Sequence, residues 1–334
     1  MRLVAADDAG IARAVEVLSD GGLVAFPTET VYGLGADARN ADAVRRLFAA
    51  KGRPADHPVI VHLATAAAAM TWARLPPVAA HHLAAAFWPG PLTLIVPRAA
   101  GVDDVVTGGQ DTVGLRVPSH PVAQRLLATF GGGIAAPSAN RFGRISPTTA
   151  EHVADDLGDR VDLILDGGAC SVGIESTIVA CIDDRPMLLR PGGIGAAALE
   201  AVLVQSGGAP LAMRRDDAPR ASGTLASHYA PRTPARLVDA ADLAACIARA
   251  SGTIAVLARS MPAPAAFRGA WIAAPRDAES YTRELYANLR RLDREGAEVI
   301  LVEMPPDEAA WHAVHDRLAR AAHPAEPDAM DDID

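Results

Sequence analysis

Helical and β-strand patterns alternate along most of residues 1–204, and this alternation predicts an α/β fold. Short apolar runs, typical of buried strands, are separated by helical periods or by turns rich in Gly and Pro. Several predicted strands follow one another without a helix between them, so we expect a mixed sheet. Strands are predicted at residues 23–26, 59–62, 92–96, 112–117, 134–136, 163–166, 176–181 and 187–189, and helices from 11 to the glycines at 21–22, at 41–50, 76–87, 121–130 and 149–157.

The rest of the chain predicts a second, smaller α/β unit. Residues 205–234 break every period with Gly, Pro and Ser and are interpreted as a linker between residues 1–204 and residues 235–324. Residues 325–334 are an acidic tail that we expect to be disordered. The second unit has the element order of a small Rossmann-like domain, with a helix at 240–250, a strand at 253–257, a helix at 280–295, a strand at 298–303 and a helix at 308–322.

Composition and charge narrow the classes of function. The 334 residues are 50% hydrophobic, which is enough for two domains with their own cores. The net charge of −9 argues against tight general binding to nucleic acid, because such binding needs a basic surface. The first residues lack a signal pattern and no apolar stretch reaches membrane-spanning length, so we expect a cytoplasmic protein without membrane contact. Cys170, Cys181 and Cys246 are too scattered for a disulfide framework or a zinc site, and we expect them to be reduced and mostly buried.

Lys51 is the only lysine of the chain, and the other 30 of its 31 basic residues are arginines. It begins the run KGRPADHP at residues 51–58, between a predicted helix and a strand, where Lys51 and Arg53 can converge on one anion. Lysine offers a compact point charge and arginine a fixed planar fork, so the exception indicates a position that needs an ammonium. No P-loop sequence occurs, so a phosphate here would be held by side-chain cations. A structural turn, or a surface lysine left by a drift toward arginine, is the alternative.

Residues 26–37, FPTETVYGLGAD, follow a predicted strand and place hydroxyl groups at Thr28, Thr30 and Tyr32. The glycines that follow fit a loose dinucleotide-binding pattern. That motif needs a second strand ending in an acid about 20 residues later, and Asp56 lies instead in a polar loop flanked by prolines. We therefore interpret the hydroxyl cluster as the lining of a ligand pocket, with a solvated turn as the alternative.

Two arginines stand within or at the end of apolar strand patterns. Burial of an unpaired guanidinium is costly, so Arg116 and Arg190 each predict an anionic partner, either a ligand's carboxylate or phosphate or an internal salt bridge. His62 ends a strand pattern, where a side chain at the carboxyl edge can face a crevice, although a lone histidine is more often a core or surface residue. Neither His57 nor His62 has partners at metal-ligand spacing, so no protein metal site is predicted.

Three loops beside predicted strands are rich in small and hydroxyl-bearing residues. They read AAPSAN at 135–140, RISPT at 144–148 and GIESTI at 173–178. Small side chains let a ligand approach the backbone, and hydroxyls offer hydrogen bonds to it. None of the loops has the GxSxG form of a nucleophile elbow and no Ser-His-Asp set is apparent, so covalent catalysis is not indicated.

Together these runs resemble the threonylcarbamoyl-AMP synthase family, in its longer form with a YrdC-like catalytic domain and a small second domain. The resemblance implies a twisted mixed sheet with flanking helices and a concave active-site face, followed by a small Rossmann-like α/β domain. The matching runs, in family order, are FPTETVYGL at 26–34, KGRP at 51–54, WPGPLT at 88–93, PSAN at 137–140, EST at 175–177, LRPG at 189–192, HYAP at 228–231 and DRL at 316–318.

The resemblance implies a reaction. L-threonine, bicarbonate and ATP would give threonylcarbamoyl-adenylate and pyrophosphate, with Mg²⁺ on the phosphates. The product is the activated precursor of threonylcarbamoyladenosine in tRNA, so a tRNA threonylcarbamoyl transferase complex is the expected downstream partner. Catalysis would depend on positioning and charge stabilisation.

The resemblance also implies roles for individual residues. Lys51 and Arg53 would be catalytic, and Arg116 would grip the carboxylate of threonine. The linker would close over the pocket and limit water. L-threonine would be bound by Thr30, His62, Arg116, Ala136 and Ser176, and ATP by Lys51, Arg53, His57, Thr112, Ser138, Asn140, Ser146, Arg190 and Tyr229.

Two departures and two other functions stay open. His57 stands where the family often has Asn, and residues 222–224 read SGT where the linker commonly has Pro-Gly-Met. A carbamoyl-transfer module related to hydrogenase maturation shares the YrdC-like motifs, but such proteins carry acylphosphatase and zinc-finger segments, and this chain has no CxxC pair. A non-catalytic RNA-binding module is the other alternative, and the net charge of −9 favours a small ligand over it.

Overall fold

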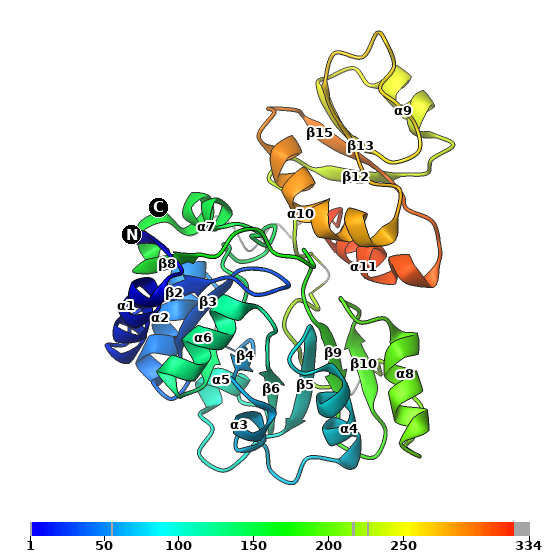
Figure 1. The fold of residues 1–334 in the computed structure, drawn as a ribbon. Helices are drawn as coiled ribbons and strands as arrows, with labels where there is room; N and C mark the ends of the chain where they lie inside the picture. The colour runs from blue at the N-terminus through cyan, green and yellow to red at the C-terminus, as the bar shows by residue number, and fades with distance from the viewer. Residues whose placement is uncertain (1, 55, 216–217, 226, 324–334) are drawn as a thin grey trace. The chain divides into compact units, whose positions relative to one another are not determined.

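The computed structural model describes residues 2–54, 56–215, 218–225 and 227–323, which form two compact units (Figure 1). The first unit is Met1–Phe142 with Ser146–Thr224, and the second is Gly143–Ile145 with Leu225–Asp334. The segment interpreted as a linker is thus divided between the units after Thr224. The acidic tail predicted at 325–334 lies outside the described residues.

Eleven strands form one sheet in the described part of the first unit. All eight predicted strands are present, each within two residues of its predicted ends, whereas the first, third and eleventh strands were not predicted. They are β1 (Arg2–Ala5), β2 (Val24–Phe26), β3 (Gly33–Asp37), β4 (Ile60–His62), β5 (Leu92–Pro97), β6 (Thr112–Arg116), β7 (Ile134–Ala135), β8 (Leu163–Asp166), β9 (Thr177–Ala180), β10 (Met187–Arg190) and β11 (Ala212–Met213).

The strand order is β1-β8-β2-β3-β7-β4-β6-β5-β9-β10-β11. β4 pairs parallel with β6, whereas β2 with β3 and β5 with β6 are antiparallel, so the sheet is mixed as predicted. The antiparallel pairing of β3 also explains why the glycine pattern after residue 32 is not a dinucleotide loop. The glycines lie inside a strand that returns along β2, and they do not open a helix, since the next helix begins only at Ala41.

The helices of the first unit cover both faces of the sheet (Figure 1). Side chains alternate between the two faces along each strand. In β8, Leu163 and Leu165 pack toward α1 and α6, while Ile164 belongs to the larger core that contains α2, α4, α7 and α8. The helices are α1 (Asp8–Ser19), α2 (Ala41–Lys51), α3 (Ala66–Met70), α4 (Val78–Phe87), α5 (Asp104–Thr107), α6 (Pro121–Phe130), α7 (Ala150–Leu157), the 3₁₀ turn η1 (Gly158–Arg160) and α8 (Ala196–Gln205).

One part of the sheet face is covered by extended chain. Ile95 of β5, Ile178 of β9 and Met187 of β10 form a small core with Ala221, which comes from the segment interpreted as a linker. This part of the sheet thus carries apolar contacts from residues beyond the last helix of the first unit.

The second unit has a parallel four-stranded sheet of order β12-β15-β13-β14. Its element order matches the small Rossmann-like domain predicted from the sequence, except that its first and third strands, β12 and β14, were not predicted. The elements are β12 (Ala235–Val238), α9 (Leu243–Arg249), β13 (Ile254–Ala258), β14 (Ala270–Ala273), α10 (Ala278–Asp293), β15 (Val299–Glu303), the 3₁₀ turn η2 (Ala309–Trp311) and α11 (His312–Ala321).

Two further features of the described residues concern apolar helices and cysteines. No helix among them is long and apolar enough to cross a bilayer. Cys170 and Cys181 are buried, as predicted for most of the cysteines, Cys246 is half-buried, and no disulfide joins these three.

Candidate active site

Lys51, the last residue of α2, is buried against the loop that follows β7. Its Nζ donates to the carbonyl oxygens of Ser138 and Asn140, both at 2.5 Å. Burial, followed by the neighbouring Arg53 guanidinium, lowers the pKa of Lys51 well below its ordinary value. A compact ammonium can donate to two convergent carbonyls in a small space, which a planar guanidinium does not do as readily. The only lysine of the chain therefore fixes residues 138–140, two of which are predicted to contact ATP.

A glycine turn brings Arg53 next to Lys51. Gly52 ends α2 in the left-handed region with φ 65°, a conformation that suits glycine, and the chain then reverses. Arg53 is buried, its Nη2 donates to Pro58 O at 2.8 Å, and its guanidinium lies 5.7 Å from the ring of Phe142. Two cations so close together create a field that favours a bound anion.

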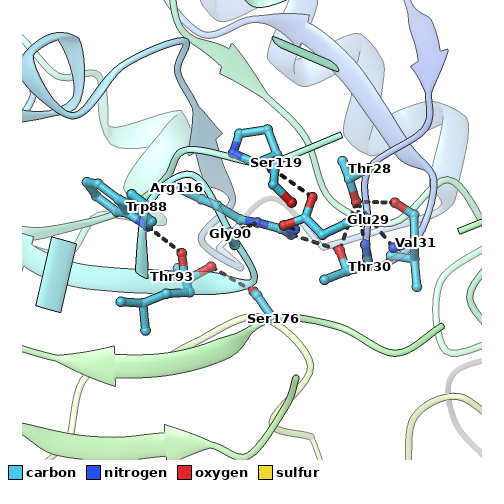
Figure 2. A network of polar contacts seen from close by, with 12 residues as sticks. Thr28, Glu29, Thr30, Val31, Trp88, Gly90, Thr93, Arg116, Ser119 and Ser176 are labelled. Carbon is cyan, nitrogen blue, oxygen red and sulfur yellow. Dashed lines mark hydrogen bonds and ion pairs between the residues drawn. The ribbon is translucent and has the colours of Figure 1, made fainter. Parts of the chain in front are cut away.

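Arg116 ends β6 and forms a buried network with the loop after β2, shown in Figure 2. Its Nη2 pairs with Glu29 Oε1 at 2.7 Å, its Nη1 donates to Thr30 Oγ1 at 2.9 Å, and its Nε donates to Gly90 O at 3.4 Å. Glu29 also accepts a hydrogen bond from Ser119 N at 3.0 Å. Of the two partners that the sequence left open for Arg116, the structure shows an internal salt bridge.

That salt bridge still leaves Arg116 suited to a ligand. A guanidinium has five N–H donors, and the hydrogen bonds to Glu29, Thr30 and Gly90 use three of them within the described part of the chain. The side chains of Arg116 and Glu29 are only 5% and 6% exposed, so their attraction is weakly screened and the guanidinium is held in one orientation. A fixed fork with free donors is the geometry that recognises a carboxylate.

Ser176 joins a second hydrogen-bonded group beside the first. Its Oγ is 2.7 Å from Thr93 Oγ1 (Figure 2), and its carbonyl oxygen accepts from Arg190 Nε at 3.3 Å and Nη2 at 2.9 Å. Arg190 Nη1 also donates to Ser222 O at 2.8 Å, and Ser222 Oγ lies 3.5 Å from Arg53 Nη2. Ser222 therefore links two of the cations that the resemblance places around ATP.

His62 ends β4 next to Arg116 in the parallel register with β6. It is buried, its Nδ1 is 3.3 Å from Ile60 O, and its ring meets Phe26 edge-on. Burial, followed by the charge of Arg116, lowers the pKa of His62 to about 3. The imidazole is therefore neutral near pH 7, and it can serve as a hydrogen-bonding group without adding charge to the site.

The lowered pKa of His62 makes stability depend on pH. The unfolded chain has a histidine pKa of about 6.5 and the folded chain one of about 3, so the unfolded state binds more protons between these values. We expect the free energy of unfolding to fall as pH drops from 6.5 toward 3, by at most about 1.4 kcal/mol per pH unit for this residue. His62→Asn should show a shallower slope when urea unfolding is measured at pH 4.5, 5.5, 6.5 and 7.5. An identical slope in both proteins would contradict the assignment.

Ser146 and Thr112 lie at other points of the first unit. Ser146 Oγ donates to Glu175 Oε1 at 2.5 Å, with both residues buried. Thr112 begins β6 and lines a cavity of about 10 Å³, together with Thr93, Gly114, residues 220–222 and others. A cavity of that size holds about one water molecule.

Thirteen of the fourteen predicted site residues lie in the first unit. Ala136 is buried beside β4, and its N–H donates to Ile60 O at 2.9 Å. His57 is half-buried, 3.3 Å from Asp56 and edge-on to Phe142. Tyr229 lies in the second unit, where it is buried against Tyr286 and Arg317.

Four further polar residues belong to these networks and were not predicted. Glu29 stands between two threonines, and Glu175 directly precedes Ser176, both in matched runs. A single acid in a run of polar residues, as at Glu29, is a signal for pairing with a buried cation. Thr93 lies in a strand beside four apolar residues, and Ser222 lies in a segment without periodicity. No sequence pattern marks the last two, because their contacts join segments far apart in the chain.

Gly192 allows the close approach on which Ser176 depends. A Cβ atom at this position would lie 2.4 Å from Thr177 N and 2.5 Å from both Glu175 O and Ser176 C, all backbone atoms. We expect Gly192→Ala to lower the free energy of unfolding by about 2–4 kcal/mol and to reduce activity, since the backbone must move. Gly195→Ala is the control, because nothing lies within 4 Å of its Cβ position and loss of a glycine N-cap costs about 1 kcal/mol or less. Equal melting temperatures for the two variants would contradict this account.

Among its described residues, the first unit therefore holds four buried cations, two buried acids and several hydroxyls in hydrogen-bonded networks. Such an arrangement can bind and orient small anions and stabilise charge that develops between them. These features, with the small parallel α/β unit that follows, define a two-domain α/β protein whose first unit is suited to binding small anions. Comparison with known proteins identifies its family. A family model described as telomere recombination matches residues 16–192, and one described as the threonylcarbamoyl-AMP synthase C-terminal domain matches residues 194–323. The chain belongs to the threonylcarbamoyl-AMP synthase family.

Individual relatives span nearly the whole chain. The threonylcarbamoyl-AMP synthase of Pyrococcus abyssi is 39% identical over 317 residues, which covers 91% of this chain and 92% of the relative. That of Bacillus subtilis is 39% identical over 328 residues, covering 95% and 94%. The crystal structure of P. abyssi Sua5 complexed with L-threonine has a TM-score of 0.87 with this structure at 36% identity, covering 96% of each chain.

Proposed function

We propose that this chain is an L-threonylcarbamoyladenylate synthase, which condenses L-threonine, bicarbonate and ATP to threonylcarbamoyl-AMP and pyrophosphate. The observation that carries the proposal is the buried network of Arg116, Glu29 and Thr30, which presents a fixed guanidinium with free donors. The similarity over 96% of the chain to a structure complexed with L-threonine supports the same assignment.

In this proposal the first unit binds threonine by its carboxylate. Arg116 holds that carboxylate, and the hydroxyls of Thr30 and Ser176 with the neutral ring of His62 surround the rest of the amino acid. Bicarbonate would take up a proton and lose water to give carbon dioxide, and the free amine of threonine would capture it as a carbamate, releasing a proton. A neutral His62 suits this step. A protonated His62 would be a second cation beside Arg116, and it would attract a further anion next to the proposed site of the threonine carboxylate.

A carbamate oxygen would then attack the α-phosphorus of ATP, forming a P–O bond as the bond to pyrophosphate breaks. Lys51 and Arg53 would act on this step, Lys51 by holding the loop at 138–140 and Arg53 by its charge. Arg190, Thr112, Ser138, Asn140 and Ser146 would complete the ATP site, with contributions from His57 and Tyr229. Catalysis in such a site comes from positioning and charge stabilisation.

Mg²⁺ would enter with ATP. Within the described residues no group of three or more His, Cys, Asp or Glu side chains could hold a metal ion, and both Glu29 and Glu175 are engaged with protein donors. Magnesium commonly keeps its waters and binds substrate phosphates with few protein ligands, so this donor set fits that mode. Bound there, it would neutralise phosphate charge.

The product would be used in the cytoplasm by an enzyme complex that transfers the threonylcarbamoyl group to tRNA. The carbamoyl-transfer alternative is weakened by the second unit, because the model for the C-terminal domain of threonylcarbamoyl-AMP synthase matches residues 194–323. The RNA-binding alternative is weakened by the net charge of −9.

Pyrophosphate release tests the proposal. Purified protein would be incubated with ATP, Mg²⁺ and bicarbonate, with L-threonine, with L-serine or with no amino acid. Release that depends on threonine is expected. If folded protein that binds ATP releases no pyrophosphate under any combination, the proposal fails, and a filter-binding titration with RNA across salt concentrations would test the non-catalytic alternative.

A further inference from the structure

The loop Gly143–Ile145 interrupts the first unit in sequence but packs as part of the second. Ala230 N donates to Gly143 O at 2.9 Å, and Arg144 forms a parallel bridge with Ala230. Arg144 Nη1 also donates to Pro231 O at 3.3 Å. The loop backbone is therefore held like a short strand against residues 230–231.

Arg290 of α10 holds the other end of this loop. Its Nη2 donates to the carbonyl oxygen of Ile145, and the two residues are 8% and 3% exposed. Tyr286, one helical turn earlier on the same face, stacks on Tyr229 with ring centroids 5.8 Å apart. A charged donor to a buried carbonyl is a strong hydrogen bond, and its loss leaves that carbonyl without its partner.

The residues on both sides of the loop are fixed in the first unit. Asn140 O accepts from Lys51 Nζ, and Phe142 N donates to Lys51 O at 2.9 Å. Ser146, directly after Ile145, donates its Oγ hydrogen to Glu175 at 2.5 Å. Because the peptide plane is rigid, a movement of the Ile145 carbonyl is passed to the Ser146 nitrogen.

We propose that Arg290 is a positioning residue for the ATP site, which acts by holding the Ile145 carbonyl and so setting the position of Ser146. The inference rests on the proposed function, in which Asn140 and Ser146 contact ATP. The inference gives a residue of the second unit a role in nucleotide binding. That role depends on the loop Gly143–Ile145, which lies in the sequence between the proposed ATP contacts Asn140 and Ser146. A displacement of about 1 Å in such a group can cost up to about 10²-fold in rate.

Steady-state kinetics of pyrophosphate release provide the first test. Arg290→Met keeps the length of the side chain and removes its donors. It should raise the KM for ATP about 10- to 100-fold with a much smaller change in the KM for L-threonine, since only the nucleotide contact is displaced. Arg290→Lys, which retains a donor, should recover part of the loss. Arg291→Met is the matched control, because Arg291 is exposed on the next position of α10, and it should behave as wild type. Equal changes in both KM values, or none in either, would overturn the inference.

Hydrogen exchange gives a second test that does not need activity. Amide exchange of the peptide covering residues 142–148 should become faster in Arg290→Met and stay unchanged in Arg291→Met, while peptides of β13 and β15 keep their protection. Unchanged exchange at 142–148 in Arg290→Met would overturn the inference. A wild-type protein without threonine-dependent turnover would defeat the proposed function alone, because the exchange result would still report whether Arg290 holds the loop. If Arg290→Met loses protection throughout the second unit, the variant is unfolded there, and Arg290→Lys replaces it as the test. The KM for ATP and the amide exchange at 142–148 are then measured on Arg290→Lys, and no change in either would overturn the inference.

Discussion

Replacing Arg116 with alanine should lower kcat/KM for L-threonine by about 10²- to 10³-fold. The variant loses the proposed charge pair between the guanidinium and the carboxylate of threonine, and truncating one member of a buried, hydrogen-bonded charge pair costs about 3–4 kcal/mol. The KM for ATP should change far less, since the guanidinium contacts Glu29, Thr30 and Gly90 on the threonine side of the proposed site. Pyrophosphate release measured at varied threonine and saturating ATP checks this.

A double variant separates ligand binding from the salt bridge. Arg116→Ala leaves Glu29 buried without its cation, so the melting temperature should also fall. In Arg116→Met with Glu29→Gln both charges are gone, and most of the stability should return. Activity should remain low in the double variant if Arg116 binds the carboxylate of threonine. Recovery of activity together with stability would mean that Arg116 serves only to neutralise Glu29.

Replacing Lys51 with arginine should reduce kcat nearly as much as replacing it with alanine, by about 10²-fold. The Nζ atom donates to two carbonyl oxygens 2.5 Å away, and the larger planar guanidinium does not fit between them, so residues 138–140 must shift. The same kinetic assay and a thermal melt check both variants.

The control for Lys51 is another position of the same helix. Arg45, on α2, has a side chain that is 61% exposed, and Arg45→Lys should leave kcat and the melting temperature unchanged. Near-normal turnover in Lys51→Arg would show that any cation suffices at residue 51. In that case the single lysine of the chain would have no special role.

The strands and helices that were predicted well are those with strong local signals. Helix α6 begins with a proline and is capped at its C-terminus by Gly131, and its predicted ends match the observed Pro121–Phe130. Strands β1 and β3 were not predicted, because β1 is mostly exposed and β3 contains two glycines, so neither shows the usual apolar pattern. Helix α8 was also not predicted, since its mostly apolar residues give no clear helical period.

The sequence predicted which segments carry the residues of the candidate site, but it did not predict which of these residues contact one another. The sequence placed cations at Lys51, Arg53, Arg116 and Arg190, but it left open whether Arg116 meets a ligand or an internal acid. The structure shows the salt bridge with Glu29, a residue 87 positions away in the chain. Glu29 lies in a loop and Arg116 ends a strand, so their contact depends on how distant segments fold together, and no local pattern encodes it.

By itself the sequence determined the α/β class, the order of the elements and the residue types of the site, because periodicity and unusual residues such as the single lysine are local properties. Only the tertiary structure decided which residues meet. It brought Ser222 between Arg53 and Arg190, and it assigned Gly143–Ile145 to the second unit. Both results depend on contacts between segments far apart in the chain, and such contacts form only when the whole chain has folded.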